Sequence, residues 1–197
     1  MNTTCEVKYD NPDAVQIVSN AIFGLLCEYN NSKHAIACIG TDKVVFDSVG
    51  PIVGTFLTEM DIGVPVVGTL EYPMHNLNIK NRTDKLYKEY GDRCIIAIDA
   101  VVIENRLNFE EKFGVISVTP KPIIPGRGAG STDNKPIGDI SIKVQTVYAA
   151  EVDRNGPIRL HYIIEICKVI SKSIEIALGT YYNYLNSEED NSEALYH

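Results

Sequence analysis

The stretch Cys38-Ile-Gly-Thr-Asp-Lys-Val-Val-Phe-Asp-Ser-Val-Gly-Pro51 connects a predicted strand to a predicted helix. The apolar run Ala35–Ile39 leads into it and indicates a buried strand. The apolar residues between Ile52 and Met60 recur at helical spacing and predict an amphipathic helix. Pro51 suits the first turn of that helix, because the N–H that proline lacks has no intrahelical partner there. A strand, a glycine-containing loop and a helix in this order are typical of an α/β fold.

The loop carries the acidic residues with the clearest chemical interest. Asp47 follows the carboxyl end of the strand and precedes the helix N-terminus, whose dipole presents its positive end there. Ligands of open α/β sheets bind at this edge. We therefore expect an active site to include Asp47, with Thr41 and Ser48 beside it. Asp42 lies in the same loop, and we expect its side chain to be solvated.

Strands and helices continue to alternate along the chain. Cys94–Ile98 is a continuous apolar run of the kind buried on both faces of a parallel sheet. Phe113–Val118 and the alternating positions of Ile140–Thr146 predict two further strands, and Asn155-Gly-Pro157 opens a long helix. This order predicts an α/β fold, a three-layer α-β-α sandwich with a mostly parallel, mixed sheet.

Length and charge limit the classes of partner. The 197 residues suit one domain, predicted over residues 1–185 and followed by an acidic, disordered tail over 186–197. Lys and Arg number 18 against 26 Asp and Glu, and the net charge of −8 disfavours duplex nucleic acid and anionic membranes. No apolar run approaches the ~20 residues of a membrane span. The first residues lack the order of a signal peptide, so a cytoplasmic protein is expected.

Cysteine and histidine spacing predicts neither a metal site nor a cofactor. The five cysteines form no C-x-x-C pair and no zinc-ligand pattern, and three of them lie within apolar runs. We expect these thiols to be structural. The four histidines are spread along the chain without the spacing of metal ligands.

A second aspartate pairs naturally with Asp47. Asp99 follows the run Cys94–Ile98, and we expect the two strands that precede Asp47 and Asp99 to be neighbours. Two nearby carboxyl groups do not both ionise readily, so one holds a proton while the other is charged. That division supplies a general acid and a general base. The alternative interpretation is that each is a helix cap or loop organiser. Ser48 and His75 are a weaker nucleophile–base candidate, since serine at a helix start is usually a cap.

A glycine-rich segment, Pro125–Gly130, follows the third strand. Gly126, Gly128 and Gly130 do not form the phosphate-binding pattern G-x-x-x-x-G-K-[ST]. A turn that needs positive φ angles is the favoured interpretation.

Three motifs occur in one order: Gly40-x6-Asp47-x2-Gly50-Pro51, Ile96-Ala-Ile-Asp99-Ala100 and Pro125-Gly-x-Gly-x-Gly130. With these three motifs in this order, the chain resembles the YyaC-type sporulation proteins of spore-forming Firmicutes across most of its length. More distantly it is similar to the spore germination protease, an atypical aspartic protease. That resemblance implies that Asp47 and Asp99 are the catalytic pair.

The same fold resembles the hydrogenase maturation endopeptidases, which use nickel bound in their substrate. In that family a later histidine is the third nickel ligand, and this chain has no histidine between His75 and His161. Thr41 also stands where both protease families carry asparagine after the glycine.

Together these features predict a sporulation protein of the forespore or spore interior. We expect it to act as an aspartic-type endopeptidase on a spore protein or peptide, with the segment Pro125–Gly130 shaping the cleft. Two alternatives stay open: a catalytically inactive homologue that binds a spore protein or peptide, and a metal-dependent maturation peptidase. The residues leave open whether the chain is an enzyme and whether it forms an oligomer.

Overall fold

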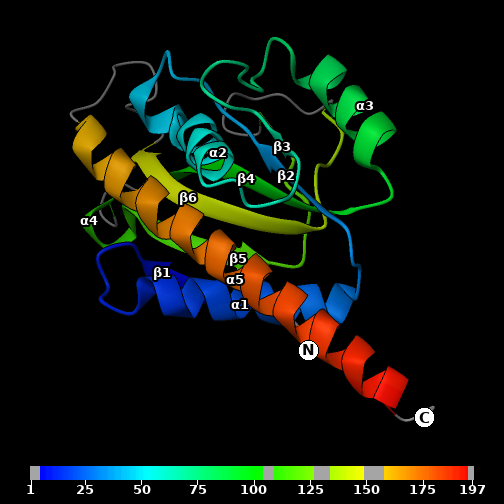
Figure 1. Ribbon diagram of the computed structural model, residues 1–197. Helices are drawn as coiled ribbons and strands as arrows, with labels where there is room; N and C mark the ends of the chain where they lie inside the picture. The colour runs from blue at the N-terminus through cyan, green and yellow to red at the C-terminus, as the bar shows by residue number, and fades with distance from the viewer. Residues whose placement is uncertain (1–4, 104–108, 127–133, 149–157, 195–197) are drawn as a thin grey trace.

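The computed structural model describes residues 5–103, 109–126, 134–148 and 158–194 (Figure 1). The strands are β1 (Cys5–Lys8), β2 (His34–Cys38), β3 (Val66–Val67), β4 (Cys94–Ile103), β5 (Val115–Thr119) and β6 (Ile140–Tyr148). The helices are α1 (Ala14–Tyr29), α2 (Val49–Glu59), α3 (Ile79–Tyr90), α4 (Phe109–Lys112) and α5 (Leu160–Ala194), and a short 3-10 helix, η1 (Val45–Asp47), precedes α2. In this part of the chain no helix is both long enough and apolar enough to cross a membrane.

The strands form one mixed sheet in the order β1-β5-β6-β4-β2-β3. Strands β3, β2, β4 and β6 are parallel to one another, β5 pairs antiparallel with β6, and β1 pairs antiparallel with β5. The predicted fold, an α/β sandwich of three layers with a mostly parallel sheet, is confirmed. Strand β1 and helix α4 were not predicted, because four residues are too few for either hydrophobic period to stand out.

Helices α1, α2 and α5 cover one face of the sheet and α3 covers the other (Figure 1). Every residue of β2 is buried, which explains its uninterrupted apolar sequence. Ile36 and Cys38 pack with the first group of helices, while Ala35 and Ala37 pack on the side of α3. The same alternation in β4 assigns each residue to one face. Cys38, Cys94 and Cys167 are buried free thiols, as predicted.

Helix α5 is the longest element and crosses the whole molecule (Figure 1). Its buried side chains share one face and pack on the sheet and α1: Ile163, Ile166, Cys167, Ile170, Ile174, Ala177, Leu178 and Tyr181. The tail predicted to be disordered from residue 186 is instead helical as far as Ala194. Once a helix has formed, each further residue adds one backbone hydrogen bond, so the packed part of α5 can extend beyond the core. A side-chain hydrogen bond also supports this extension, because the Tyr184 hydroxyl donates to Glu188 Oε1 at 2.6 Å. The predicted start at 155–157 lies outside the described residues.

Candidate functional site

The loop after β2 closes on itself through Asp47. The Thr41 N–H donates to the Asp47 carbonyl oxygen at 3.0 Å and to Asp47 Oδ2 at 3.1 Å. Asp47 is the last residue of η1, and only Ser48 separates it from α2, so the predicted position between strand end and helix start is correct. Its carboxylate also accepts a backbone hydrogen bond, which is the role of a loop organiser.

Two glycines allow this loop to lie close to the sheet. Gly40 has φ of 139°, and a Cβ atom there would overlap the carbonyl oxygen of Asp47. A Cβ atom at Gly50 would overlap the carbonyl oxygen of Ile39. The spacing of glycine and aspartate in the first motif therefore has a steric origin: the backbones of the loop and of α2 approach too closely for any side chain.

Ser48 occupies the position before α2 but does not cap it. Its hydroxyl donates backwards to the Val45 carbonyl oxygen at 2.6 Å, and the side chain is only 3% exposed. The expected cap is therefore wrong, because the 3-10 turn offers a closer acceptor than the helix amides offer a donor. Pro51 lies in the first turn of α2 as predicted.

Asp99 lies inside β4 and not after its end, which corrects the sequence prediction. Strand β4 continues to Ile103 because β6 pairs with it beyond the end of β2, with Asp99 opposite Lys143. The end of β2 is level with this point, since Cys38 pairs with Ile98. The predicted neighbourhood of the two strands is correct, and the side chain of Asp99 is 9% exposed.

The two carboxyl groups are coupled. Burial raises the pKa of Asp47 to about 6, although the hydrogen bond from Thr41 lowers it. Burial also raises the pKa of Asp99 well above its usual value, and the nearby Asp47 carboxylate raises it further. The Ala100 N–H and the Lys143 ammonium oppose that rise. Burial thus favours the protonated form of both carboxyl groups, and the Asp47 charge strengthens that preference at Asp99.

The remaining sequence candidates surround the pair unevenly. Thr41 is half-buried and Asp42 is exposed, as expected for a solvated residue. The Gly40 N–H donates to the Met74 carbonyl oxygen at 2.9 Å, so His75 follows a residue that touches the loop. His75 Nδ1 accepts the Leu77 N–H at 3.3 Å. The His75 imidazole thus stabilises the turn between His75 and Leu77, and among the described residues it forms no hydrogen bond to Asp47 or Asp99.

The glycine-rich segment is described only in part. Gly126 has φ of 77°, which agrees with a turn that requires glycine. The Asn134 side-chain amide donates to the Pro125 carbonyl oxygen at 3.0 Å and ties the two sides of the segment together. Gly128 and Gly130 lie outside the described residues, so their part in a cleft stays a prediction.

Two residues near the pair were missed by sequence reasoning. Lys143 faces Asp99 across the β4–β6 ladder, a position that depends on strand register. Thr146 is fully buried and donates to the Phe46 carbonyl oxygen at 3.0 Å, which ties η1 to β6. Thr146 is a polar residue at an alternating position that Ile140, Ile142 and Val144 fill with apolar side chains. A polar residue at such a position was the signal in the sequence that it has a buried hydrogen-bond partner.

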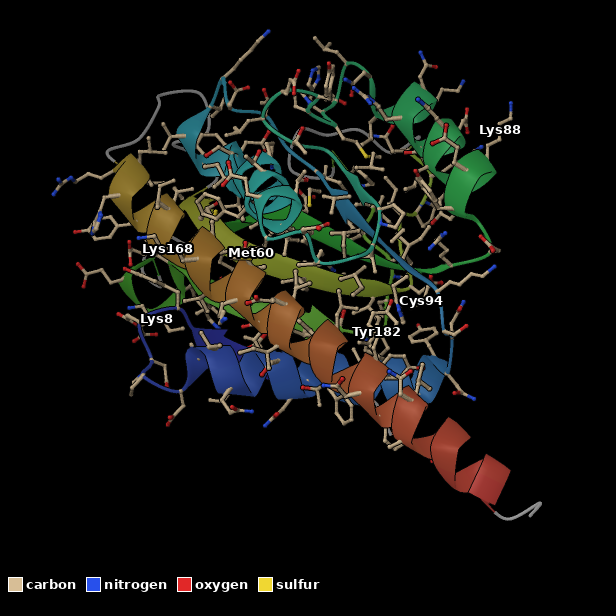
Figure 2. All side chains as sticks on the ribbon, viewed as in Figure 1. Lys8, Met60, Lys88, Cys94, Lys168 and Tyr182 are labelled. Carbon is tan, nitrogen blue, oxygen red and sulfur yellow. The ribbon has the colours of Figure 1, made fainter. Side chains whose placement is uncertain are left out.

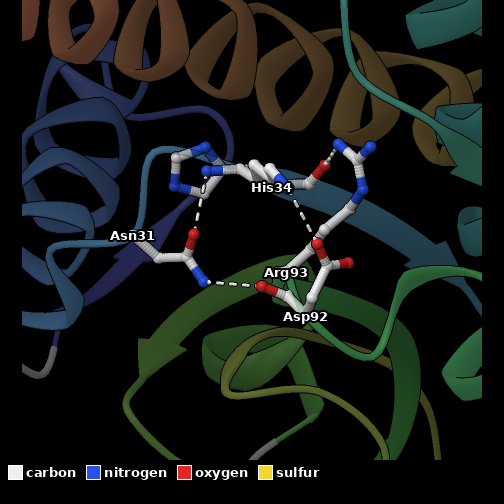
Figure 3. Close-up of polar contacts among 5 residues, drawn as sticks. Asn31, His34, Asp92 and Arg93 are labelled. Atoms are coloured by element: carbon white, nitrogen blue, oxygen red, sulfur yellow. Dashed lines mark hydrogen bonds and ion pairs between the residues drawn. The ribbon is translucent and has the colours of Figure 1, made fainter.

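A second polar cluster lies at the starts of β2 and β4, away from the ends of the strands near Asp47 and Asp99 (Figure 3). The Asn31 side-chain amide donates to the Asp92 carbonyl oxygen at 3.1 Å, and Asn31 Oδ1 accepts the Lys33 N–H at 2.9 Å. The Lys33 ammonium pairs with Asp92 Oδ2 at 3.0 Å, and Arg93 donates to the His34 carbonyl oxygen at 3.3 Å. These contacts join the starts of the two strands.

His34 connects that cluster to α5. Its Nδ1 lies 2.9 Å from the Tyr182 hydroxyl, and its ring meets Tyr181 edge-on. Figure 2 labels Tyr182 on α5 and Cys94 at the start of β4. Burial lowers the pKa of His34 to about 4, with the Arg93 charge adding to the effect. The imidazole is neutral at physiological pH, and we assign it to packing of α5 on the sheet.

Within the described residues, no group of three or more His, Cys, Asp or Glu is placed to hold a metal ion. The protein is therefore a three-layer α/β protein with two interacting carboxyl groups, the half-buried Asp47 and the buried Asp99, beside the end of a central strand.

The chain belongs to the family described as "Protein of unknown function (DUF1256)", whose model matches residues 6–173. It is 33% identical over 108 residues to "Uncharacterized protein YyaC" of Bacillus subtilis (strain 168), an alignment that covers 54% of this chain and 50% of that protein. The chain thus spans about half the length of the curated relative it matches. These matches confirm the predicted YyaC-type family. The similarity to the two peptidase families stays a prediction.

Proposed function

We propose that the protein is an aspartic-type endopeptidase in which Asp47 and Asp99 activate a water molecule. The observation that carries this proposal is the position of Asp47, in the loop after β2, beside Asp99 of the neighbouring strand β4, where the Asp47 charge raises the pKa of the buried Asp99. A pair of acids with separated pKa values supplies one proton acceptor and one proton donor at the same pH. The motif resemblance to the germination protease supports the same pair.

The roles follow from the protonation states. Ionised Asp47 accepts a proton from the attacking water, and the oxygen adds to the scissile carbonyl carbon. Protonated Asp99 donates its proton to the carbonyl oxygen as the tetrahedral intermediate forms. Collapse of that intermediate breaks the C–N bond as the proton held by Asp47 passes to the leaving amine. One hydroxyl proton of the intermediate returns to Asp99, which leaves a carboxylic acid product and restores both side chains. We expect the rate to rise with pH through about 6, where Asp47 ionises, and to fall where Asp99 loses its proton.

A spore protein or peptide is the proposed substrate, and the forespore or spore interior the proposed location; both rest on the resemblance to YyaC-type sporulation proteins. The test incubates the wild type, Asp47→Asn, Asp99→Asn and the control Asp42→Asn with small acid-soluble spore proteins. Asp42 is the matched control because it is an exposed carboxylate of the same loop. We expect cleavage by the wild type and by Asp42→Asn only, with all four proteins folded.

Cleavage that persists in Asp47→Asn or Asp99→Asn would remove the pair from the mechanism, because residues that act as a unit lose most of the rate together. The second candidate function is a catalytically inactive protein that binds a spore protein or peptide. The hydrogen bond from Thr41 to Asp47 Oδ2 favours it, since that oxygen already has a structural partner. Binding without any cleavage would establish this candidate in place of the peptidase.

A further inference from the structure

Strand β3 leaves one side of the sheet open. It is the last strand in the sheet order, and it pairs only with β2 among the described residues. The Ile36 N–H donates to the Pro65 carbonyl oxygen at 2.9 Å, so the carbonyl, which is the backbone hydrogen-bonding group of Pro65, faces β2. Successive residues of a strand point these groups to opposite sides, and therefore the N–H and C=O of Val66 face outward. An extended chain that lies along β3 can pair with them.

A shallow depression adjoins this edge. It is lined by Val67 of β3 and by Arg82, Lys85, Leu86 and Glu89 of α3. Val67 and Leu86 are the apolar residues of this lining, and Arg82, Lys85 and Glu89 are its charged residues. The depression thus offers a place for a side chain next to a backbone edge that offers hydrogen bonds.

The helix beside the depression is basic although the protein is acidic. The chain carries a net charge of −8. Over its length, α3 has four basic residues and two acidic ones: Lys80, Arg82, Lys85 and Lys88 against Asp84 and Glu89. Lys135 adds a further positive charge through its 2.9 Å ion pair with Asp84. Figure 2 shows Lys88 at the outer side of α3. Basic residues therefore outnumber acidic ones along α3, although the protein as a whole is acidic.

We propose that the β3 edge and the α3 depression bind an acidic, extended segment of a partner protein. The segment adds a strand to the sheet beside β3, and main-chain hydrogen bonds supply affinity independent of sequence. One acidic side chain enters the depression between Arg82 and Lys85, and the positive field of α3 selects acidic over basic segments. This binding does not depend on hydrolysis at Asp47 and Asp99.

The experiment measures fluorescence anisotropy with a fluorescein-labelled peptide of four Val-Glu repeats. Three other probes accompany it: a Val-Lys peptide, a Val-Glu peptide N-methylated at alternate residues to block strand pairing, and a single-stranded RNA. Binding is measured for both the wild type and Asp99→Asn, so that a failure of the proposed hydrolysis leaves the result unaffected. We expect only the unmodified Val-Glu peptide to bind, with an affinity that falls as salt is added.

Lys85→Glu is compared with Lys168→Glu, a matched control. Both lysines are exposed on helices, 65% and 60% respectively, and both pair with a glutamate of their own helix. Figure 2 places Lys168 on α5, away from α3. We expect Lys85→Glu combined with Arg82→Glu to weaken the Val-Glu peptide at least about tenfold, and Lys168→Glu to leave it unchanged. Bound peptide should also slow hydrogen exchange of the Val66 amide.

Four outcomes with the probes and variants overturn the proposal. They are absence of binding at millimolar Val-Glu peptide, equal weakening by Lys168→Glu, equal binding of the N-methylated peptide, and stronger binding of the RNA. A dimer that forms without any probe, and that Lys85→Glu dissociates in sedimentation, would assign this surface to a second copy of the chain and would also overturn it.

Discussion

Replacement of Asp47 by Asn should stabilise the protein at high pH and have little effect at low pH. The pKa of Asp47 is raised from 3.8 to about 6 by burial, so ionisation is harder in the folded protein than in the unfolded chain. Between these values the folded state binds more protons than the unfolded state, and the free energy of unfolding therefore falls as pH rises. Asn resembles the protonated acid in shape and does not ionise.

The magnitude follows from the pKa shift. One unit corresponds to 1.36 kcal/mol, so the shift of Asp47 from 3.8 to about 6 implies that ionised Asp47 destabilises the fold by about 3 kcal/mol at pH 8. At pH 4 the same shift leaves roughly 0.6 kcal/mol. For a protein of this size, about 3 kcal/mol raises the melting temperature by roughly 6–12 °C. Loss of the Asp47 charge also eases ionisation of Asp99, which acts in the same direction.

The assay is urea unfolding of the wild type and Asp47→Asn at pH 4 and pH 8, with Asp42→Asn as control. Asp42→Asn changes the net charge equally, but Asp42 is exposed, and we expect a change within about 0.5 kcal/mol at both pH values. Other titrating groups are shared by the proteins at each pH, so their contributions largely cancel. Equal effects of Asp47→Asn at the two pH values, or an equal gain in Asp42→Asn, would refute the raised pKa and with it the separated acid pair.

Three further predictions concern the rest of the fold. Because His34 is buried in its neutral form, with a pKa of about 4, its contribution to stability should be complete above pH 6.5 and lost progressively toward pH 4; His34→Phe should flatten that part of the pH–stability curve in urea titrations. An unchanged curve would contradict the lowered pKa. Gly40→Ala should lower the free energy of unfolding by more than about 3 kcal/mol, because its Cβ would overlap the Asp47 backbone. Gly63→Ala is the control, since Gly63 also has positive φ but faces open space, and it should cost about 1 kcal/mol in the same urea titrations. Equal costs would refute the steric argument. Deletion of residues 187–197 should shift the melting temperature by less than about 2 °C, because the side chains of Ser187 and Glu188 are exposed; a larger fall would show that the end of α5 packs on the body.

The sequence by itself determined the local features of this protein. The continuous apolar runs of β2 and β4 predict buried parallel strands, because both faces of such strands are covered by helices. The spacing of Gly40 and Asp47 indicated a tight loop between a strand and a helix. Each of these signals comes from neighbouring residues, and local sterics and hydrophobic period are enough to decide them.

Tertiary structure decided what depends on pairing between distant segments. Asp99 lies inside β4 because β6 continues beside it past the end of β2, and Lys143 faces Asp99 for the same reason. Strand register depends on pairing between segments far apart in sequence, and the continuous apolar run of β4 does not by itself say which residues of β6 lie opposite it. The raised pKa values of Asp47 and Asp99 likewise depend on burial by the assembled layers, since desolvation arises only when helices, loop and sheet pack together.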